Sequence, residues 1–371
     1  MSVDSIFSET GPLARAIPGY RPRAGQLLMA HTVEGALSRE EVLAVEAPCG
    51  VGKSLAYLIP AITLAVERNQ RVIVSTGMIS LQEQLLGKDL PMLRDALPYD
   101  FTFALAKGKS NFLCRHRLAE PDELLVNSQE NAEHLERLLQ WAEATVTGDK
   151  AHVTDPEGKP WSPPEEVWAM VTSGSDECLG KACPHREGCF YEAAKRRWKT
   201  ARIVVCNHHL LVLDLLMGGI ILGEAGAVIV DEAHRLPDSA RGALGYEVGF
   251  GSVARLAARV AAEGHEEAAD DLRAEGRAFF EQLTAYRLTP KTYKARIRVP
   301  GVVDTQPLLS ALGWAREKLR AEEASIDTSD PCCDDDEKER RALLHKLAER
   351  CGDISERIHN AISLVDPQQI V

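Results

Sequence analysis

The sequence has 371 residues, of which 45% are hydrophobic and 26% charged, and its 43 Lys and Arg against 55 Asp and Glu give a formal net charge of −12. This composition predicts a globular protein of roughly two or three domains and excludes a wholly disordered chain, a collagen and a simple coiled coil. The acidic balance argues against a general polyanion binder, because phosphate contacts need clustered Lys and Arg. The longest apolar stretch, 210–222, is interrupted and too short to span a bilayer, and the N-terminus lacks the regions of a secretory signal. We therefore expect a cytoplasmic protein that does not bind membranes.

The first 110 residues alternate between strand and helix patterns. An amphipathic helix is predicted around 24–37, a short buried strand at 42–46, a helix from Lys53, a second strand at 71–75 and a helix over 80–87. Alternation at this spacing favours an α/β fold with a mostly parallel, doubly wound sheet.

The rest of the chain divides into three parts. Residues 115–200 are polar, hold three cysteines within a dozen positions and are predicted to form an inserted module. Short buried-strand runs return at 202–205 and 227–230, and from about residue 236 the chain is predicted to be helical. The last predicted helix, 337–365, places apolar residues on one stripe that is typical of helix–helix packing. These are Leu343, Leu347, Cys351, Ile354, Ile358, Ile362 and Val365.

Residues 47–54, APCGVGKS, lie between a predicted strand and a predicted helix and fit the Walker A phosphate loop, except that Ala47 replaces the usual first glycine. Glycine at 50 and 52 would let backbone N–H groups turn inward around a phosphate. The Lys53 ammonium would contact the β- and γ-phosphates, and the Ser54 hydroxyl would bind Mg²⁺. The alternative is a chance glycine turn. The predicted ATP-binding residues of the loop are Gly50, Val51, Gly52, Lys53 and Ser54.

Residues 228–234, VIVDEAH, read as an apolar strand that ends in two acids. A strand end beside the phosphate loop is where Walker B carboxylates belong. We expect Asp231 to hold Mg²⁺, Glu232 to polarise the attacking water and His234 to couple hydrolysis to the nucleic-acid side. Taken alone, the DEAH segment could equally be a solvated turn, and its pairing with the glycine loop is what favours catalysis.

Together these segments resemble the XPD/DinG type of superfamily 2 DNA helicase over about residues 20–236. The resemblance rests on 21–26, APCGVGKS, STGMISLQEQL at 75–85, KGKSNFLC at 107–114, VCNHHLL at 205–211 and DEAH. It implies that Arg21 and Gln26 recognise adenine. It also implies that Ser75, Thr76 and Gln82 contact the backbone of a single strand, although Ser75 and Thr76 could simply cap the next helix. The role of Asn207 and His208 stays open.

Four cysteines form a candidate metal site: Cys114, Cys178, Cys183 and Cys189, which enclose 63, four and five residues. Four thiolates can hold Zn²⁺ or an iron–sulfur cluster. A zinc ribbon usually shows two CxxC knuckles, and this sequence has none. One distant and three clustered cysteines resemble the [4Fe–4S] site of the helicase family, so a [4Fe–4S] cluster is expected, with zinc or unliganded thiols as alternatives.

Cations and aromatic residues around these cysteines are candidates for a DNA path, because single-strand binding uses cations for the backbone and aromatic rings for base stacking. The competing interpretation is a solvated basic helix with its aromatic rings in a small core. The cations are Lys107, Lys109, Arg115, Arg117, Lys195, Arg196, Arg197 and Lys199, and the aromatic residues are Phe112, Phe190, Tyr191 and Trp198.

The resemblance implies a RecA-like P-loop lobe built from 1–112 and 201–236, an iron–sulfur module at 113–200 and a helical arch-like domain at 237–371. No SAT or QxxGRxxR segment follows residue 234, so we expect the second RecA-like lobe to be absent and the chain to be a fragment that does not unwind DNA alone.

The implied function is that of an ATP-dependent helicase moving 5′ to 3′ on single-stranded DNA, with forked or R-loop DNA as substrates. Whether a protein complex, such as a CRISPR complex, recruits it is left open. The alternatives are a non-enzymatic nucleic-acid- or protein-binding module with a vestigial nucleotide site, and a P-loop ATPase with a zinc site and no DNA role.

Overall fold

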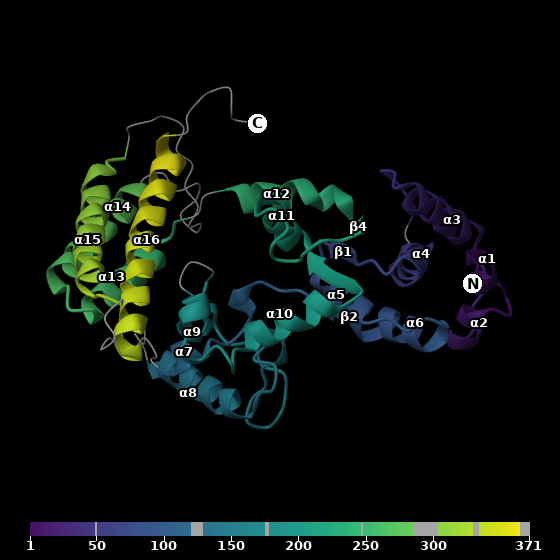
Figure 1. The fold of residues 1–371 in the computed structure, drawn as a ribbon, viewed down its shortest axis with the longest axis horizontal. Helices are drawn as coiled ribbons and strands as arrows, with labels where there is room; N and C mark the ends of the chain where they lie inside the picture. Colours follow the sequence, from purple (N-terminus) through teal and green to yellow (C-terminus); the bar gives the residue numbers. More distant parts are fainter. Residues whose placement is uncertain are drawn as a thin grey trace. The chain divides into compact units, whose positions relative to one another are not determined.

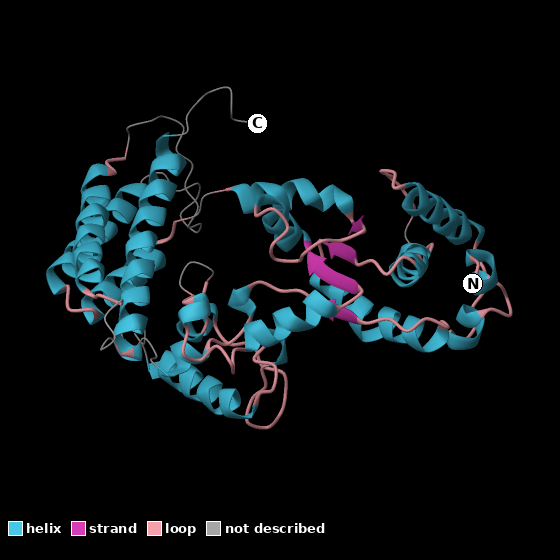
Figure 2. Cartoon of the chain, in the orientation of Figure 1, coloured by secondary structure: helices cyan, strands magenta, loops and turns pink. Residues whose placement is uncertain are grey.

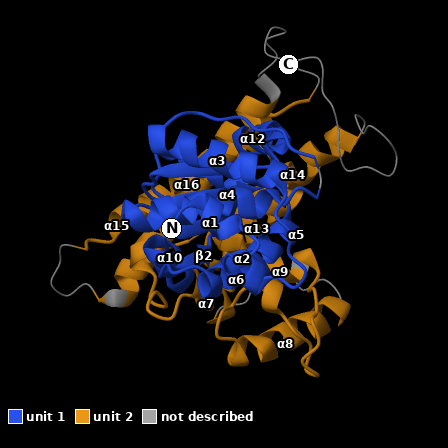
Figure 3. Ribbon diagram, turned by 90° about the vertical axis from the view of Figure 1, so that its right-hand side faces the viewer, with its two compact units in different colours: residues 1–108, 192–244 blue, residues 109–191, 245–371 orange. Residues whose placement is uncertain are grey.

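The structure is a computed structural model that describes residues 1–48, 50–119, 129–174, 178–245, 248–284, 303–328 and 334–363. Helices make up most of it (Figures 1 and 2). The chain divides into two compact units, of which unit 1 comprises residues 1–108 and 192–244, and unit 2 comprises residues 109–191 and 245–371 (Figure 3). Among the residues described, no helix is both long and apolar enough to cross a membrane.

Unit 1 contains a parallel sheet of four strands in the order β2-β3-β1-β4. This confirms the predicted α/β class. The register places Thr76 on β1 opposite both Asn207 on β3 and Asp231 on β4, so the carboxyl ends of three strands meet at one edge. The strands are β1 Val72–Thr76, β2 Phe103–Leu105, β3 Ile203–Asn207 and β4 Ala227–Asp231.

The central strands β1 and β3 are apolar and buried on both faces, whereas β2 and β4 are only partly buried and Val228 on β4 is exposed. Val72, Val74 and Val205 point to one face, where they pack with Leu58 and Ile62 of helix α4 in the core of the unit. The helices assigned wholly or mainly to unit 1 are α1 Val3–Phe7, α2 Pro12–Ala16, α3 Ala24–Arg39, α4 Lys53–Glu67, α5 Ile79–Gln84, α6 Leu90–Ala96, α10 Phe190–Thr200, α11 His208–Leu216 and α12 Leu236–Leu244. A π-helical turn, Leu85–Asp89, joins α5 to α6, and a 3-10 turn, Ala233–Arg235, precedes α12.

The predicted strand at 42–46 is wrong. The segment has no regular secondary structure, and its apolar side chains are exposed, Val42 completely. A β-branched run forms a strand only where neighbouring strands and helices cover it, and nothing covers this one. The structure instead adds β2, which is too short to give a periodic signal in the sequence. The predicted strands at 71–75, 202–205 and 227–230 are confirmed with shifts of one or two residues.

Unit 2 combines the cysteine-containing segment with a helical bundle. In the bundle, α13 contacts α14, α14 contacts α15, α15 contacts α16 and α16 contacts α13 (Figure 1). The α-helices are α7 Arg115–Ala119, α8 Gln129–Ala144, α9 Glu165–Val171, α13 Phe250–Ala262, α14 Glu266–Thr284, α15 Gln306–Ser325 and α16 Asp335–Ser363. Short 3-10 turns cover Lys109–Asn111, Lys150–His152 and Gly180–Ala182.

The predicted packing stripe of the last helix is confirmed where the structure describes it. Leu347, Cys351, Ile354 and Ile358 are buried in the bundle core, and Leu343 packs against it. Val365 and the side chain of Ile362 lie outside the described residues. The roles predicted for the lobe, module and arch segments stay predictions.

Candidate functional site

The glycine loop leads directly into helix α4. Gly50 has φ 84° and Gly52 has φ 88°, both in the left-handed region that favours glycine. The helix begins at Lys53, which places Ser54 in its first turn. Cys49 lies outside the described residues. The loop therefore has the glycine conformations and the following helix start that phosphate binding needs, although the segment before it is not a strand.

Gln26 holds this loop through its backbone. The side chain is buried, and its Nε2 donates to the carbonyl oxygen of Gly52 at 2.9 Å. A Cβ at position 52 would lie 2.2 Å from that Nε2, so any other residue here would displace the Gln26 amide and would also be strained at φ 88°. Arg23, which the sequence analysis did not single out, donates from Nη1 to the Gly50 carbonyl. Arg21 is exposed. Gln26 thus contacts the glycine loop itself. Its role in adenine recognition stays a prediction.

Asp231 ends β4 with its carboxylate held at both oxygens. Its Oδ2 accepts a hydrogen bond from the Tyr57 hydroxyl at 2.9 Å, and its Oδ1 accepts one from the backbone N–H of Glu232 at 2.9 Å. Burial, together with the neighbouring Asp231, raises the pKa of Tyr57 well above its ordinary value, so the hydroxyl stays protonated. Tyr57 therefore fixes the carboxylate of Asp231, one of the two predicted Mg²⁺ ligands.

Sequence reasoning missed Tyr57, although a signal was available. Tyr57 lies one helical turn after Lys53, and residues four apart share a helix face. Only the fold brings that face against the end of β4.

Lys53 and Glu232 form an ion pair across the site, with Lys53 Nζ 3.2 Å from Glu232 Oε1. Glu232 has φ 53°, an uncommon conformation for a residue other than glycine, and this turns its side chain toward the loop. His234 Nδ1 lies 3.4 Å from the second carboxylate oxygen of Glu232, while its side chain is 69% exposed. The structure thus brings together Lys53, Asp231, Glu232 and His234 from segments far apart in the sequence.

The residues predicted to contact a DNA strand are less accessible. Ser75 and Thr76 are fully buried and Gln82 is nearly so. The Thr76 hydroxyl accepts the backbone N–H of Met78 at 3.3 Å, the residue before α5, so it holds the turn without capping the helix. Asn207 caps α11 by accepting the Leu210 N–H at 2.7 Å. In this conformation these groups support the strand-end turns, and their contact with DNA stays a prediction.

The four predicted cluster ligands are partly exposed and form no disulfide. Burial raises the pKa of Cys114 and Cys183, and the three other thiols raise that of Cys183 further, so the four lie near one another. Among the described residues, however, no group of three or more His, Cys, Asp or Glu side chains is arranged to hold a metal ion. The donor chemistry fits a thiolate-bound centre, whereas the coordination geometry is not formed.

For three of the four aromatic residues near the cysteines the structure favours the small-core alternative, whereas Tyr191 is half-buried. Phe112, Phe190 and Trp198 are buried, so their rings fill small cores rather than offering faces to bases. Arg115 stacks over the Phe190 ring, and Arg117 is also buried. By contrast, α10 presents exposed cations to solvent. These are Arg196, Arg197 and Lys199.

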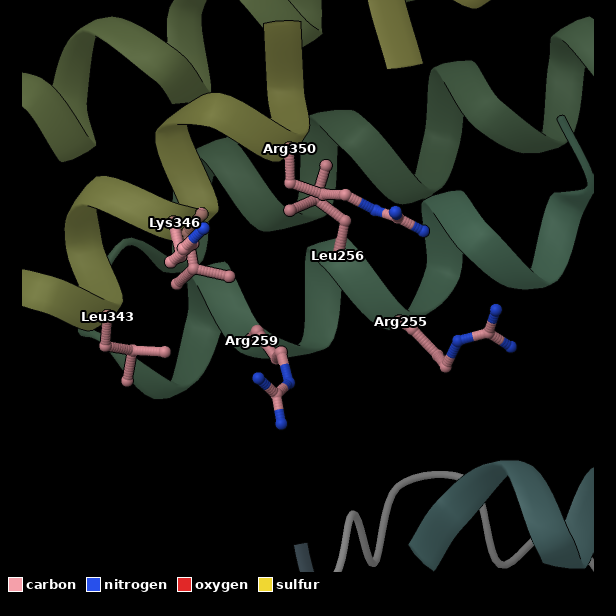
Figure 4. A pocket seen from close by; sticks show the side chains of 7 residues that line it. Arg255, Leu256, Arg259, Leu343, Lys346 and Arg350 are labelled. Atoms are coloured by element: carbon pink, nitrogen blue, oxygen red, sulfur yellow. The ribbon is translucent and has the colours of Figure 1, made fainter. Parts of the chain in front are cut away.

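A second cationic site lies in the bundle of unit 2 (Figure 4). Arg255 and Arg259 are one turn apart on α13, and Lys346 and Arg350 are one turn apart on α16. The four cations line a small hollow that is open to solvent and whose apolar lining is Leu256, Leu343 and Leu347. We call these seven residues the basic groove. Its charge suits an anionic ligand despite the acidic balance of the whole chain.

Comparison with known proteins finds relatives that are named as helicases. The family described as DEAD_2 matches residues 168–252. The chain is 38% identical over 241 residues to the ATP-dependent DNA helicase YoaA of Escherichia coli, a match covering 63% of this chain and 36% of the relative. It is 36% identical over 278 residues to the ATP-dependent helicase DinG of Mycobacterium tuberculosis, covering 70% of this chain and 41% of the relative. The chain thus spans about two fifths or less of these relatives.

Among solved structures, one titled XPD_Helicase aligns with a TM-score of 0.45 and 15% identity, covering 93% of this chain and 52% of that chain.

Proposed function

We propose that this chain, a relative of the DinG-type superfamily 2 helicases, is the nucleotide-binding part of an ATP-dependent DNA helicase. The observation that carries the proposal is the pair of contacts beside the glycine loop, Lys53 with Glu232 and Tyr57 with Asp231. Bound Mg²⁺ would be held by Ser54 and Asp231 and would neutralise phosphate charge.

The chemistry follows from the groups at this edge of the sheet. The inward-facing N–H groups of the loop and the start of α4 bind the phosphates of ATP. Lys53 exchanges Glu232 for the β- and γ-phosphates, which frees the carboxylate to orient a water molecule. The water oxygen bonds to the γ-phosphorus as the bond to the bridging oxygen breaks, which yields ADP and phosphate, and the proton leaves through Glu232. His234, beside Glu232, would couple ATP hydrolysis to the nucleic-acid side.

Adenine recognition by Arg21 and Gln26 is part of the same proposal. Gln26 must release the Gly52 carbonyl, or keep that bond and offer its Oε1, when adenine binds.

The test of the nucleotide site is titration of a fluorescent ADP analogue with Mg²⁺. Lys53→Ala is expected to weaken binding by at least about ten-fold, because a charge-assisted phosphate contact is lost. The matched control is Lys88→Ala, an exposed lysine of the same unit, which should leave binding unchanged. If wild type and Lys53→Ala bound the ADP analogue with equal affinity, this loop would not be the phosphate-binding loop.

We propose single-stranded DNA, alone or at forks and R-loops, as the partner. The exposed cations of α10 and the basic groove support this proposal, because backbone phosphates need such cations. The measurement is fluorescence anisotropy with labelled single-stranded, duplex and forked DNA. Tighter binding of duplex than of single strand would contradict the proposal. Unwinding and 5′ to 3′ movement belong to the full helicase machinery, and the matches to this chain cover only 36% and 41% of the relatives.

We also propose that Cys114, Cys178, Cys183 and Cys189 hold a [4Fe–4S] cluster. The support is the donor chemistry of four neighbouring thiols. Anaerobic purification followed by iron, sulfide and zinc analysis is the test, with about four irons per chain and absorbance near ~400 nm expected. Stoichiometric zinc without colour would replace the cluster by the zinc alternative, and full metal retention in Cys183→Ser would reject this set of ligands.

A further inference from the structure

His208 lies between the two strand-end turns of unit 1. It begins α11 directly after β3, and its side chain is fully buried. On one side its Nδ1 lies 2.7 Å from the Ser75 hydroxyl oxygen, so the two share a hydrogen bond. Ser75 belongs to β1 and lies next to Thr76, the position opposite Asp231 in the sheet register.

On its other side the ring faces the acidic turn after β4. The backbone groups of Asp231 and Glu232 raise the pKa of His208, but burial lowers it more, so the ring is neutral near pH 7. Its Nε2 is buried as well. The imidazole thus bonds to Ser75 through Nδ1 and lies against the backbone of Asp231 and Glu232.

The turn that follows β1 presses against the same ring. A Cβ on Gly77 would lie 3.2 Å from His208 Cδ2 and 3.1 Å from the Cβ of Arg235, the residue that follows the DEAH segment. Gly77 is thus packed between the imidazole of His208 and Arg235, so the segment after β1 and the residue after the DEAH segment lie close to the same buried ring.

We infer that His208 is a positioning residue that couples the nucleotide site at Asp231 and Glu232 to the strand-contacting turn at Ser75–Gly77. This inference rests on the proposed function. Nucleotide that draws Lys53 away from Glu232 frees the acidic turn to move, and the imidazole transmits that movement through the hydrogen bond between its Nδ1 and the Ser75 hydroxyl.

The test measures how nucleotide changes DNA affinity. Anisotropy of labelled oligodeoxythymidylate is recorded with and without a non-hydrolysable ATP analogue and Mg²⁺. Wild type is expected to change its DNA dissociation constant by about five-fold or more, the lower range of allosteric coupling. His208→Asn keeps a polar group at the Nδ1 position, and His208→Gln keeps one at the Nε2 position. Each should reduce the change to about two-fold or less, while either ligand alone binds as in wild type.

The matched control is His209→Asn, because His209 is the exposed neighbour on the same helix turn. It should retain the wild-type coupling. A wild type that binds nucleotide or DNA but not both overturns the proposed function, and this inference with it. A wild type that binds both but without coupling, or His208 variants that keep it, overturns only the inference.

If the His208 variants do not fold, the inference is tested by measuring backbone hydrogen exchange of the wild type with and without nucleotide. Nucleotide alone should change exchange in peptides covering residues 74–79 as well as in the glycine loop. Protection confined to the loop would overturn the inference.

Discussion

At the scale of single residues, the charge of the phosphate-binding lysine is neutralised by a carboxylate of the same site. Lys53 and Glu232 satisfy each other at 3.2 Å, and both side chains are less than one-third exposed. A phosphate must therefore displace a carboxylate to reach the lysine, so the ion pair competes with the ligand.

Glu232→Gln is accordingly expected to tighten nucleotide binding by about two- to five-fold, since the competing pair contributes about 0.4–1 kcal/mol. Turnover of ATP should fall roughly 10²–10⁴-fold, because the group that orients water is lost. Titration with the fluorescent ADP analogue and a phosphate-release assay check the two effects. Weaker nucleotide binding in this variant would contradict the competition argument.

Tyr57→Phe removes the donor that fixes Asp231. The free energy of unfolding is expected to fall by about 1–2 kcal/mol, because a buried carboxylate oxygen loses its partner. The Mg²⁺ concentration for half-maximal nucleotide binding should rise about ten-fold, as is usual when the partner of a metal ligand is lost. Denaturant unfolding and Mg²⁺ titration are the measurements.

The control for Tyr57→Phe is Tyr99→Phe, whose hydroxyl bonds the N-terminal amine at the surface. Equal Mg²⁺ requirements in the two variants would show that Tyr57 only fills space.

At the scale of elements, the sequence pattern predicted helix α16 correctly but predicted a strand at 42–46 that does not form. The stripe of α16 predicted its buried face, because a helix of 29 residues repeats the apolar signal many times. Five residues at 42–46 carry β-branched side chains but no repeat, and tertiary neighbours alone decide whether they pair.

The basic groove is an element-scale feature, since it needs α13 and α16 side by side. The double variant Arg255→Ala with Arg259→Ala is expected to weaken single-strand binding and to make it less sensitive to salt. Each lost phosphate contact should reduce the slope of log affinity against log salt by about 0.7. Arg273→Ala is the control, because Arg273 lies on α14 and pairs with Asp270. An unchanged salt slope in the double variant would exclude the groove from DNA binding.

At the scale of the whole molecule, each unit has its own core with a buried thiol. Burial raises the pKa of Cys206 in unit 1 and of Cys351 in unit 2 to about 12, so both thiols stay protonated at pH 8. Cys178 and Cys189 are partly exposed.

In the native protein, iodoacetamide at pH 8 should leave Cys206 and Cys351 unmodified for as long as their units stay folded. Cys178 and Cys189 should react once any metal is removed by chelator and air, and should be protected when a cluster or zinc is bound. Peptide mapping by mass spectrometry reads each thiol separately. Rapid modification of Cys206 in folded protein would contradict the buried core of the sheet.

The α/β class, the glycine loop, the acidic strand end and the packing stripe of the last helix could all be predicted from the sequence. They depend on local spacing and periodicity, which require no knowledge of tertiary neighbours. The fold was needed to show that Tyr57 holds Asp231, that Gln26 and Arg23 bind the loop carbonyls, and that Phe112, Phe190 and Trp198 are buried. These contacts join residues that are far apart in the chain. The tertiary fold therefore determines which residues meet, and no local sequence pattern can predict these pairs.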